Sequence, residues 1–196
     1  MGVPYKTIAY QTLGCKLNFS ETSTISRDFT EYGYTKVDPH DSADVYILNT
    51  CSVTENADRK CRKSIRHLRN LNPHAFIAVT GCYAQLKPDE LSEIPEVDMV
   101  VGSGDKFHLP TLIEKSIISR QHSLYHSKID TVTEFHSSYS DTERTRAFLK
   151  IQDGCDYPCT YCTIPLARGK SRSDSIDHIL IQAKKITSKG IREIVL

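Results

Sequence analysis

Short β-prone runs alternate with helix-like stretches through the first 120 residues of this chain, and this order limits the fold more than any other feature. Strands and helices that alternate with short links fold as a parallel sheet with helices on both faces. The expected strands are residues 7–12, 44–48, 76–79 and 98–101, and the expected helices are residues 18–32, 54–70, 88–93 and 109–119. We therefore predict an α/β fold in which residues 1–120 form a doubly wound parallel sheet.

Three cysteines follow three successive expected strands. Cys15 lies just past the first strand, Cys51 just past the second and Cys82 just past the third. In an open parallel sheet, ligands bind outside the carboxyl ends of the strands, so these three thiolates can meet in one crevice. Gly14 and Gly81 precede two of them, and glycine lets the backbone approach a bulky cofactor closely. The pattern predicts an iron–sulfur cluster at Cys15, Cys51 and Cys82, and three ordinary buried cysteines are the alternative.

A second group of cysteines lies in a short polar loop after the apolar residues Ala147, Phe148, Leu149 and Ile151. Cys155, Cys159 and Cys162 have C-x3-C-x2-C spacing. Three thiolates on one loop can hold three irons of a four-iron cluster, because cysteine thiolates ligate such clusters, and the fourth iron then stays open to a small molecule. A structural zinc site would need a fourth ligand at matching spacing, and disulfides would need an oxidising compartment. The open cluster is the favoured interpretation.

The expected helix at residues 54–70 has two contrasting faces. Ala57, Cys61, Ile65 and Leu68 recur at helical spacing, so we interpret Cys61 as a small core residue and not as a metal ligand. The opposite face carries six basic residues: Arg59, Lys60, Arg62, Lys63, Arg66 and Arg69. Clustered bases on one helix can bind nucleic acid, although such a face is more often simply solvated.

The rest of the chain divides into a polar stretch and a short second unit. Residues 121–145 are rich in serine and histidine and are the expected linker. Residues 146–196 then give a strand at 147–151, a helix at 175–188 with Ile176 and Leu180 among its inward residues, and a strand from 191. This order is that of the opening βαβ unit of a (β/α) barrel, too short to close one, so we expect the chain to be a piece of a longer protein.

Composition places the chain among ordinary globular proteins. Of its 196 residues 39% are hydrophobic and 25% charged, with a formal net charge of +1. No segment approaches ~18 consecutive apolar residues, and the N-terminal residues lack an apolar signal region. Seven cysteines without an export signal indicate reduced thiols, so we expect a cytoplasmic protein that does not enter the membrane.

The cysteine motifs resemble those of the methylthiotransferase family of radical S-adenosylmethionine enzymes, in which a three-cysteine N-terminal domain precedes a radical S-adenosylmethionine barrel. The resemblance covers nearly all of the chain outside the linker. The residues of these motifs are most similar to those of the family type that acts on threonylcarbamoyladenosine in tRNA. The stretches that carry it are Thr12-Leu13-Gly14-Cys15-Lys16-Leu17-Asn18, Ile151-Gln152-Asp153-Gly154-Cys155 and Ala167-Arg168-Gly169-Lys170-Ser171-Arg172-Ser173.

This resemblance implies two four-iron clusters and S-adenosylmethionine as cofactors. Cys155, Cys159 and Cys162 would hold the radical-generating cluster, and Tyr161 would lie near the adenine of S-adenosylmethionine. The other cysteine group, Cys15, Cys51 and Cys82, would hold an auxiliary cluster that presents sulfur.

The implied reaction adds a methylthio group to C2 of N6-threonylcarbamoyladenosine 3′-adjacent to the tRNA anticodon. It needs an external electron donor and a sulfur donor, and residues 1–196 alone are expected to be inactive. The alternatives are action on isopentenyladenosine in tRNA or on an aspartate of a ribosomal protein, and a non-catalytic iron–sulfur electron-transfer module.

Overall fold

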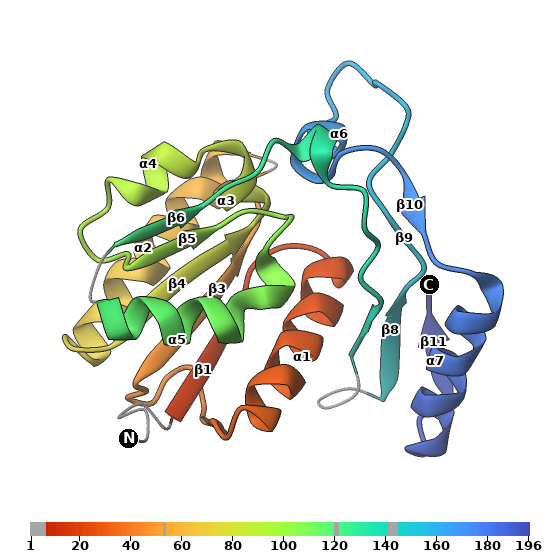
Figure 1. Ribbon diagram of the computed structural model, residues 1–196, viewed down its shortest axis with the longest axis horizontal. Helices are drawn as coiled ribbons and strands as arrows, with labels where there is room; N and C mark the ends of the chain where they lie inside the picture. The colour runs from red at the N-terminus through yellow and green to blue at the C-terminus, as the bar shows by residue number, and fades with distance from the viewer. Residues whose placement is uncertain (1–6, 53, 120–121, 141–144) are drawn as a thin grey trace.

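The N-terminal part of the chain is built on one parallel sheet of six strands (Figure 1). The computed structural model describes residues 7–52, 54–119, 122–140 and 145–196. Every neighbouring pair in the sheet is parallel, which confirms the predicted fold class. The strand order is β2-β1-β3-β4-β5-β6. The strands are β1 (Thr7–Thr12), β2 (Thr35–Lys36), β3 (Val45–Thr50), β4 (Phe76–Gly81), β5 (Met99–Val101) and β6 (Ser123–Tyr125).

Helices cover both faces of this sheet (Figure 1). One face packs on α1 (Lys16–Glu31) and α5 (Leu109–Ser119), and the other on α2 (Glu55–Leu71), α3 (Cys82–Leu86) and α4 (Pro88–Ser92). Successive strand side chains point to opposite faces, so a strand between two helical layers is apolar throughout. In β3, Val45 and Ile47 enter one core and Tyr46 and Leu48 the other.

The α2 helix begins and ends as its sequence predicts. The Thr54 side chain accepts a hydrogen bond from Ala57 N at 3.2 Å, which satisfies one of the unpaired amides of the first turn. The helix ends at Leu71, before Pro73. Cys61 is fully buried in the core on this helix, and burial raises the pKa of its thiol to about 12. This confirms Cys61 as a core residue.

Two strands of the structure lie inside the predicted linker. β6 pairs with β5 and extends the sheet by one strand, and β7 (Ser138–Tyr139) pairs antiparallel with β8 (Arg146–Lys150). A short 3₁₀ helix, η2 (Ile129–Thr131), lies between β6 and β7. Residues 121 and 141–144 of the predicted linker lie outside the described residues. The division of the chain into domains at 120 and 145 stays a prediction.

The second unit has the predicted strand–helix–strand order. β8 leads through the cysteine loop to α7 (Ile176–Ser188) and then to β11 (Glu193–Val195), which pairs with β8 in parallel. Between β8 and α7 lie β9 (Gln152–Asp153), α6 (Ile164–Arg168) and β10 (Arg172–Ser173), with β9 and β10 paired antiparallel. A complete barrel is not covered by this chain.

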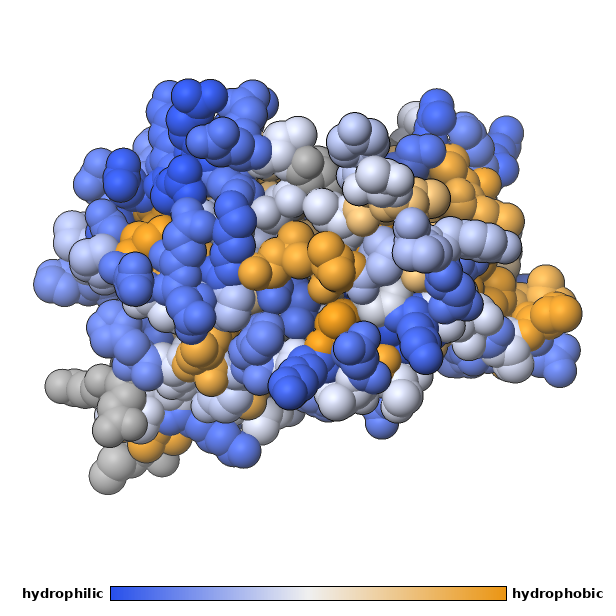
Figure 2. All heavy atoms as spheres, turned by 90° about the horizontal axis from the view of Figure 1, so that it is seen from above, coloured by the Kyte–Doolittle hydropathy of each residue, from blue (hydrophilic) through white to orange (hydrophobic). Residues whose placement is uncertain are grey.

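The α7 helix is less buried than predicted. Ile186 is fully buried, but Ile176 is 79% and Leu180 51% exposed, so these two do not point into a core as expected. The reason is that the apolar cluster of the second unit, formed with β8, β11 and Tyr139 of β7, buries Ile186 and partly buries Ile179 and Ala183, and does not include Ile176 or Leu180. Figure 2 shows apolar side chains at the end of the molecule that α7 and β11 occupy in Figure 1. No helix among the described residues is long and apolar enough to cross a bilayer.

Candidate metal centres

The sheet order brings the first three cysteines to one edge. Cys15 precedes α1 after β1, Cys51 follows β3 directly, and Cys82 follows β4 and begins α3. Since β1 and β4 both pair with β3, the three strand ends are neighbours. The chain leaves β1 and β3 toward opposite sides of the sheet, and such a switch point is where open α/β sheets form their binding crevice.

Two glycines let the cysteine loops pack against one another. Gly14 and Gly81 have φ of 111° and 96°, in the region that favours glycine. A Cβ on Gly14 would lie 2.6 Å from the Cβ of Cys51, and one on Gly81 would lie 2.4 Å from the carbonyl oxygen of Thr50. Any larger residue would therefore push the loops apart.

Asn18 ties these loops together with one buried carboxamide. Its Nδ2 donates to the carbonyl oxygens of Leu13 at 2.8 Å and Thr50 at 3.0 Å, just before Gly14 and Cys51 respectively. Its Oδ1 accepts from Cys15 Sγ at 3.6 Å and from Arg168 Nη2 at 2.7 Å. Asn18 thus holds the geometry of the site from a position that itself is fully buried.

Replacing Asn18 with alanine should lower the melting temperature of the protein. The change leaves buried carbonyls and one arginine nitrogen without this partner, and each unsatisfied buried group costs about 1–3 kcal/mol. Thermal denaturation followed by circular dichroism measures the effect. Asn56→Ala is the matched control, because Asn56 is exposed on α2. Equal melting temperatures for the two variants would contradict the role given to Asn18.

The second cysteine group lies on the loop between β9 and α6. Cys155 is half-buried, whereas Cys159 and Cys162 are exposed. Backbone hydrogen bonds shape the loop: Cys155 N donates to Gly169 O at 3.0 Å, and Cys162 N donates to Cys159 O at 3.1 Å. The paired strands β9 and β10 close its base. Tyr161, predicted to lie near S-adenosylmethionine, is 99% exposed on this loop.

The donor chemistry of both groups fits four-iron clusters. All seven cysteines are free thiols. Within the described residues, no three side chains of histidine, cysteine, aspartate or glutamate converge on a point where one metal ion could bind. A four-iron cluster does not require such convergence, because each thiolate binds a different iron of the cubane.

A buried group of five charged side chains joins α1 to the second unit. This buried charge cluster consists of Glu21, Lys106, Lys150, Asp153 and Arg168, none more than 7% exposed. Glu21 Oε1 accepts from Lys106 Nζ at 2.7 Å, from Arg168 Nη1 at 3.0 Å and from Lys150 Nζ at 3.3 Å. Arg168 Nη1 also donates to Asp153 Oδ1 at 2.8 Å. Lys106 comes from η1 (Lys106–His108), so three segments distant in sequence meet here.

These charges control one another's protonation. Burial alone would raise the pKa of Glu21, but Arg168, Lys106 and Lys150 outweigh it and hold that pKa well below its ordinary value. Burial lowers the pKa of Lys106, and Glu21 opposes that shift. Burial also raises the pKa of the Cys82 thiol, while the positive charges of Arg168 and Lys106 act to lower it. The buried charge cluster is therefore close enough to the Cys15, Cys51 and Cys82 site to influence a thiol there.

Sequence reasoning named the six cysteines, whose role as ligands stays a prediction, but it did not name the residues that contact them. Asn18, Asp153 and Arg168 stood in the quoted motifs without a role. One signal was available for α1. Asn18 and Glu21 fall on the same helical face as Ile25 and Phe29, the apolar face of that helix. Polar residues on a buried face must have hydrogen-bond partners, so the pattern indicates a buried polar contact but does not identify the partner residues.

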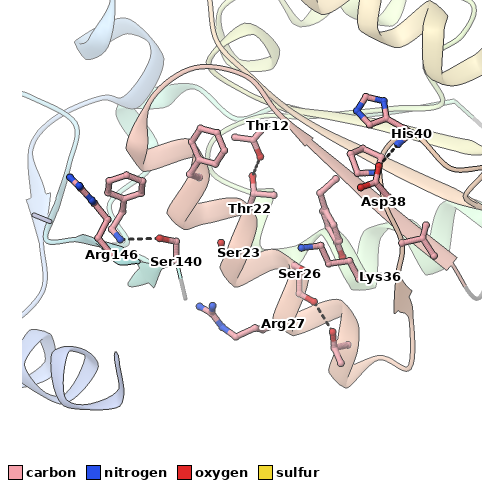
Figure 3. Close-up of a pocket in the computed structure, with 16 residues that line it drawn as sticks. Thr12, Thr22, Ser23, Ser26, Arg27, Lys36, Asp38, His40, Ser140 and Arg146 are labelled. Atoms are coloured by element: carbon pink, nitrogen blue, oxygen red, sulfur yellow. Dashed lines mark hydrogen bonds between the residues drawn. The ribbon is translucent and has the colours of Figure 1, made fainter. Parts of the chain in front are cut away.

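One sizeable cavity lies away from the cysteines, and none of the six lines it. It encloses about 730 Å³ between α1, β1, β2 and the β7–β8 pair. Figure 3 shows hydroxyl groups of Thr12, Thr22 and Ser23 on one side of it and Ser140 and Arg146 on another. The cysteine sites are loop sites at strand ends and lie outside this cavity.

The basic face of α2 is partly committed to structural contacts. Arg62 Nη1 donates to Tyr83 Oη at 2.7 Å and to Glu90 Oε1. Arg69 donates to three backbone carbonyls and to Asp98 Oδ2 at 2.8 Å. The exposed bases on this helix are Arg59, Lys60, Lys63 and Arg66. A nucleic-acid surface on α2 would therefore rest on these four residues.

Comparison with known proteins gives relatives along almost the whole chain. Residues 7–102 match the family described as "Uncharacterized protein family UPF0004". The chain is 40% identical, over 96% of its length, to "Threonylcarbamoyladenosine tRNA methylthiotransferase MtaB" of Aquifex aeolicus, and 44% identical, over 97%, to the protein of that name from Bacillus subtilis. It is also 36% identical, over 94%, to "Ribosomal protein uS12 methylthiotransferase RimO" of Clostridium tetani.

The chain spans less than half the length of these three proteins, at 47%, 43% and 42% respectively. All three carry methylthiotransferase names, although their named targets differ. The similarity covers the region that contains both cysteine groups and the contacts between them. From these relatives, and from the parallel sheet with its cysteine-bearing strand ends, we conclude that the chain belongs to the methylthiotransferase family.

Proposed function

We propose that the full-length protein is a radical S-adenosylmethionine enzyme that adds a methylthio group to C2 of N6-threonylcarbamoyladenosine, 3′-adjacent to the tRNA anticodon. The observation that carries this proposal is the presence of two separate groups of three free thiols, one at the strand ends and one on the β9–α6 loop. The choice of target is supported by the 40% and 44% identity to relatives named for threonylcarbamoyladenosine in tRNA.

Each cysteine group has its own role in this proposal. Cys15, Cys51 and Cys82 would hold the auxiliary four-iron cluster, and Cys155, Cys159 and Cys162 would hold the radical-generating one. When bound, the clusters and S-adenosylmethionine supply the sulfur, methyl and radical chemistry. The chain would position both groups, and Tyr161, whose ring is exposed, would contact S-adenosylmethionine beside the second.

The substrate is suited to a site that must reach one ring carbon. Nucleobases in single-stranded RNA loops are unstacked, so a single one can be presented to a protein. A nucleobase inside a duplex cannot be presented in this way. The exposed lysine and arginine side chains of α2 supply positive charge that can contact the phosphate backbone of the tRNA. The reaction requires an external electron donor and a sulfur donor, takes place in the cytoplasm, and needs more of the protein than residues 1–196.

Deleting the gene should remove the methylthio form of threonylcarbamoyladenosine from cellular tRNA. Mass spectrometry of tRNA nucleosides from the deletion strain and from a complemented strain measures this loss. Loss of the methylthio form of isopentenyladenosine, or of a ribosomal-protein modification, would retain the family and overturn the substrate. A complementing gene that encodes Cys155→Ala should fail to restore the nucleoside.

A further inference from the structure

The buried charge cluster carries more positive than negative charge. Lys106, Lys150 and Arg168 face only two carboxylates, Glu21 and Asp153, so one positive charge is in excess among these five residues. Arg172, whose side chain is 10% exposed, adds a further cation 3.7 Å from Asp153. Buried charges are normally paired, because an uncompensated charge in a protein interior is costly.

Arg168 of the buried charge cluster lies beside the Cys15, Cys51 and Cys82 site. Arg168 shares the Asn18 carboxamide oxygen with the Cys15 thiol. The helix that ends at Arg168 contacts the helix that begins at Cys82. Ser103 Oγ, in addition, donates to the Ala167 carbonyl at 3.0 Å and holds α6 against the sheet. The second unit thus brings its cation to the strand ends of the first.

A four-iron cluster on three thiolates is an anion. Its oxidised core carries about two positive charges against three thiolate charges, which leaves about one negative charge, and reduction adds another. Nearby positive charge favours the more negative, reduced state and so raises the reduction potential, which is one of the factors by which proteins adjust such clusters. The sign and position of the excess charge match this requirement.

We propose that the buried charge cluster, through Lys106 and Arg168, is the counter-charge of the anionic cofactor at Cys15, Cys51 and Cys82, and that it raises the reduction potential of that cofactor. The inference rests on the proposed function for the presence of the cluster. It makes Lys106 and Arg168 positioning and electrostatic residues, which act through the cofactor's surroundings and not on substrate. It also gives the contact between the two units a part in setting the properties of the auxiliary site.

The test measures a reduction potential in the full-length protein. Cys155, Cys159 and Cys162 are first replaced with alanine, so that only the auxiliary cluster forms after anaerobic reconstitution. Lys106→Met removes the excess cation and leaves two cations with two carboxylates. A redox titration followed by electron paramagnetic resonance should show the midpoint potential fall by about 59 mV, a tenfold change for one electron. Lys115→Met, an exposed lysine on α5, should leave the potential unchanged.

Each outcome decides the proposal. A Lys106→Met protein that holds its cluster at the parent's potential overturns it. A folded Lys106→Met protein that no longer retains the cluster, while Lys115→Met retains it, supports the proposal. A Lys106→Met protein that does not fold overturns it, because the cation would then not be in excess. A parent protein that binds no iron at these cysteines contradicts the proposed function instead, before any lysine variant is made.

Discussion

Replacing Cys155, Cys159 and Cys162 with alanine should remove about four of about eight irons per full-length chain. The expected total follows from two four-iron clusters, and the two cysteine groups lie on separate parts of the fold, so each should load without the other. Replacing Cys15, Cys51 and Cys82 should remove the other four. Iron and sulfide are counted after anaerobic reconstitution of each triple variant. A spectral response to added S-adenosylmethionine should disappear only in the first variant.

Cys61→Ala is the control for both triple variants. Cys61 is fully buried on α2 among core side chains, so its loss should leave the iron count unchanged while lowering stability through the small cavity created. A large iron loss from Cys61→Ala would contradict its assignment to the core. An unchanged iron count in either triple variant would remove that group from the proposed ligands.

Replacing Glu21 with glutamine should lower the free energy of unfolding by about 3–5 kcal/mol. Glu21 is fully buried and is the shared acceptor of Lys106, Lys150 and Arg168, so the isosteric change leaves three buried cations facing one carboxylate. Breaking a buried ion pair by removing one partner has a cost of this size. Urea denaturation at neutral pH measures it. Glu90→Gln, which breaks the exposed contact with Arg62, should cost about 1 kcal/mol or less.

The effect of Glu21→Gln should also depend on pH. The pKa of Glu21 in the folded protein lies well below its ordinary value of 4.5, because the three cations outweigh burial. The ionised group therefore contributes its full stability above about pH 4.5, and that contribution is lost as the pH falls toward the folded pKa. The difference between the parent and the variant should narrow below pH 4.5. A difference that stays constant between pH 7 and pH 3 would contradict this account.

The sequence was sufficient to place the cysteines because the rule that places them is local. Each of Cys15, Cys51 and Cys82 follows an apolar strand, and parallel strands that are neighbours in a sheet must end at the same edge. Finding the strands was therefore enough to predict that the three thiols gather. For the loop that carries Cys155, no prediction of strands was needed, since its three cysteines lie within eight residues of one another.

Other features could not be read from local patterns. β6 is three residues long with two polar or amphipathic ends, and only its pairing with β5 makes it a strand. In α7, periodicity identified the apolar face that contains Ile176 and Leu180, but it could not tell how much of that face would be covered. The contact between Glu21 and Arg168 depends on how the two units pack. The sequence around either residue gives no indication of its partner.

The separation of 147 positions between Glu21 and Arg168 also sets an order of events during synthesis. At about 5–20 residues per second, Arg168 leaves the ribosome roughly 7 to 30 seconds after Glu21. All six strands of the N-terminal sheet are made before Arg168, so they can pair before it arrives. Until Lys150 and Arg168 are made, Lys106 is the one cation of the three that the Glu21 carboxylate can pair with. The sheet thus forms early, and the buried charge cluster is completed only when the second unit arrives.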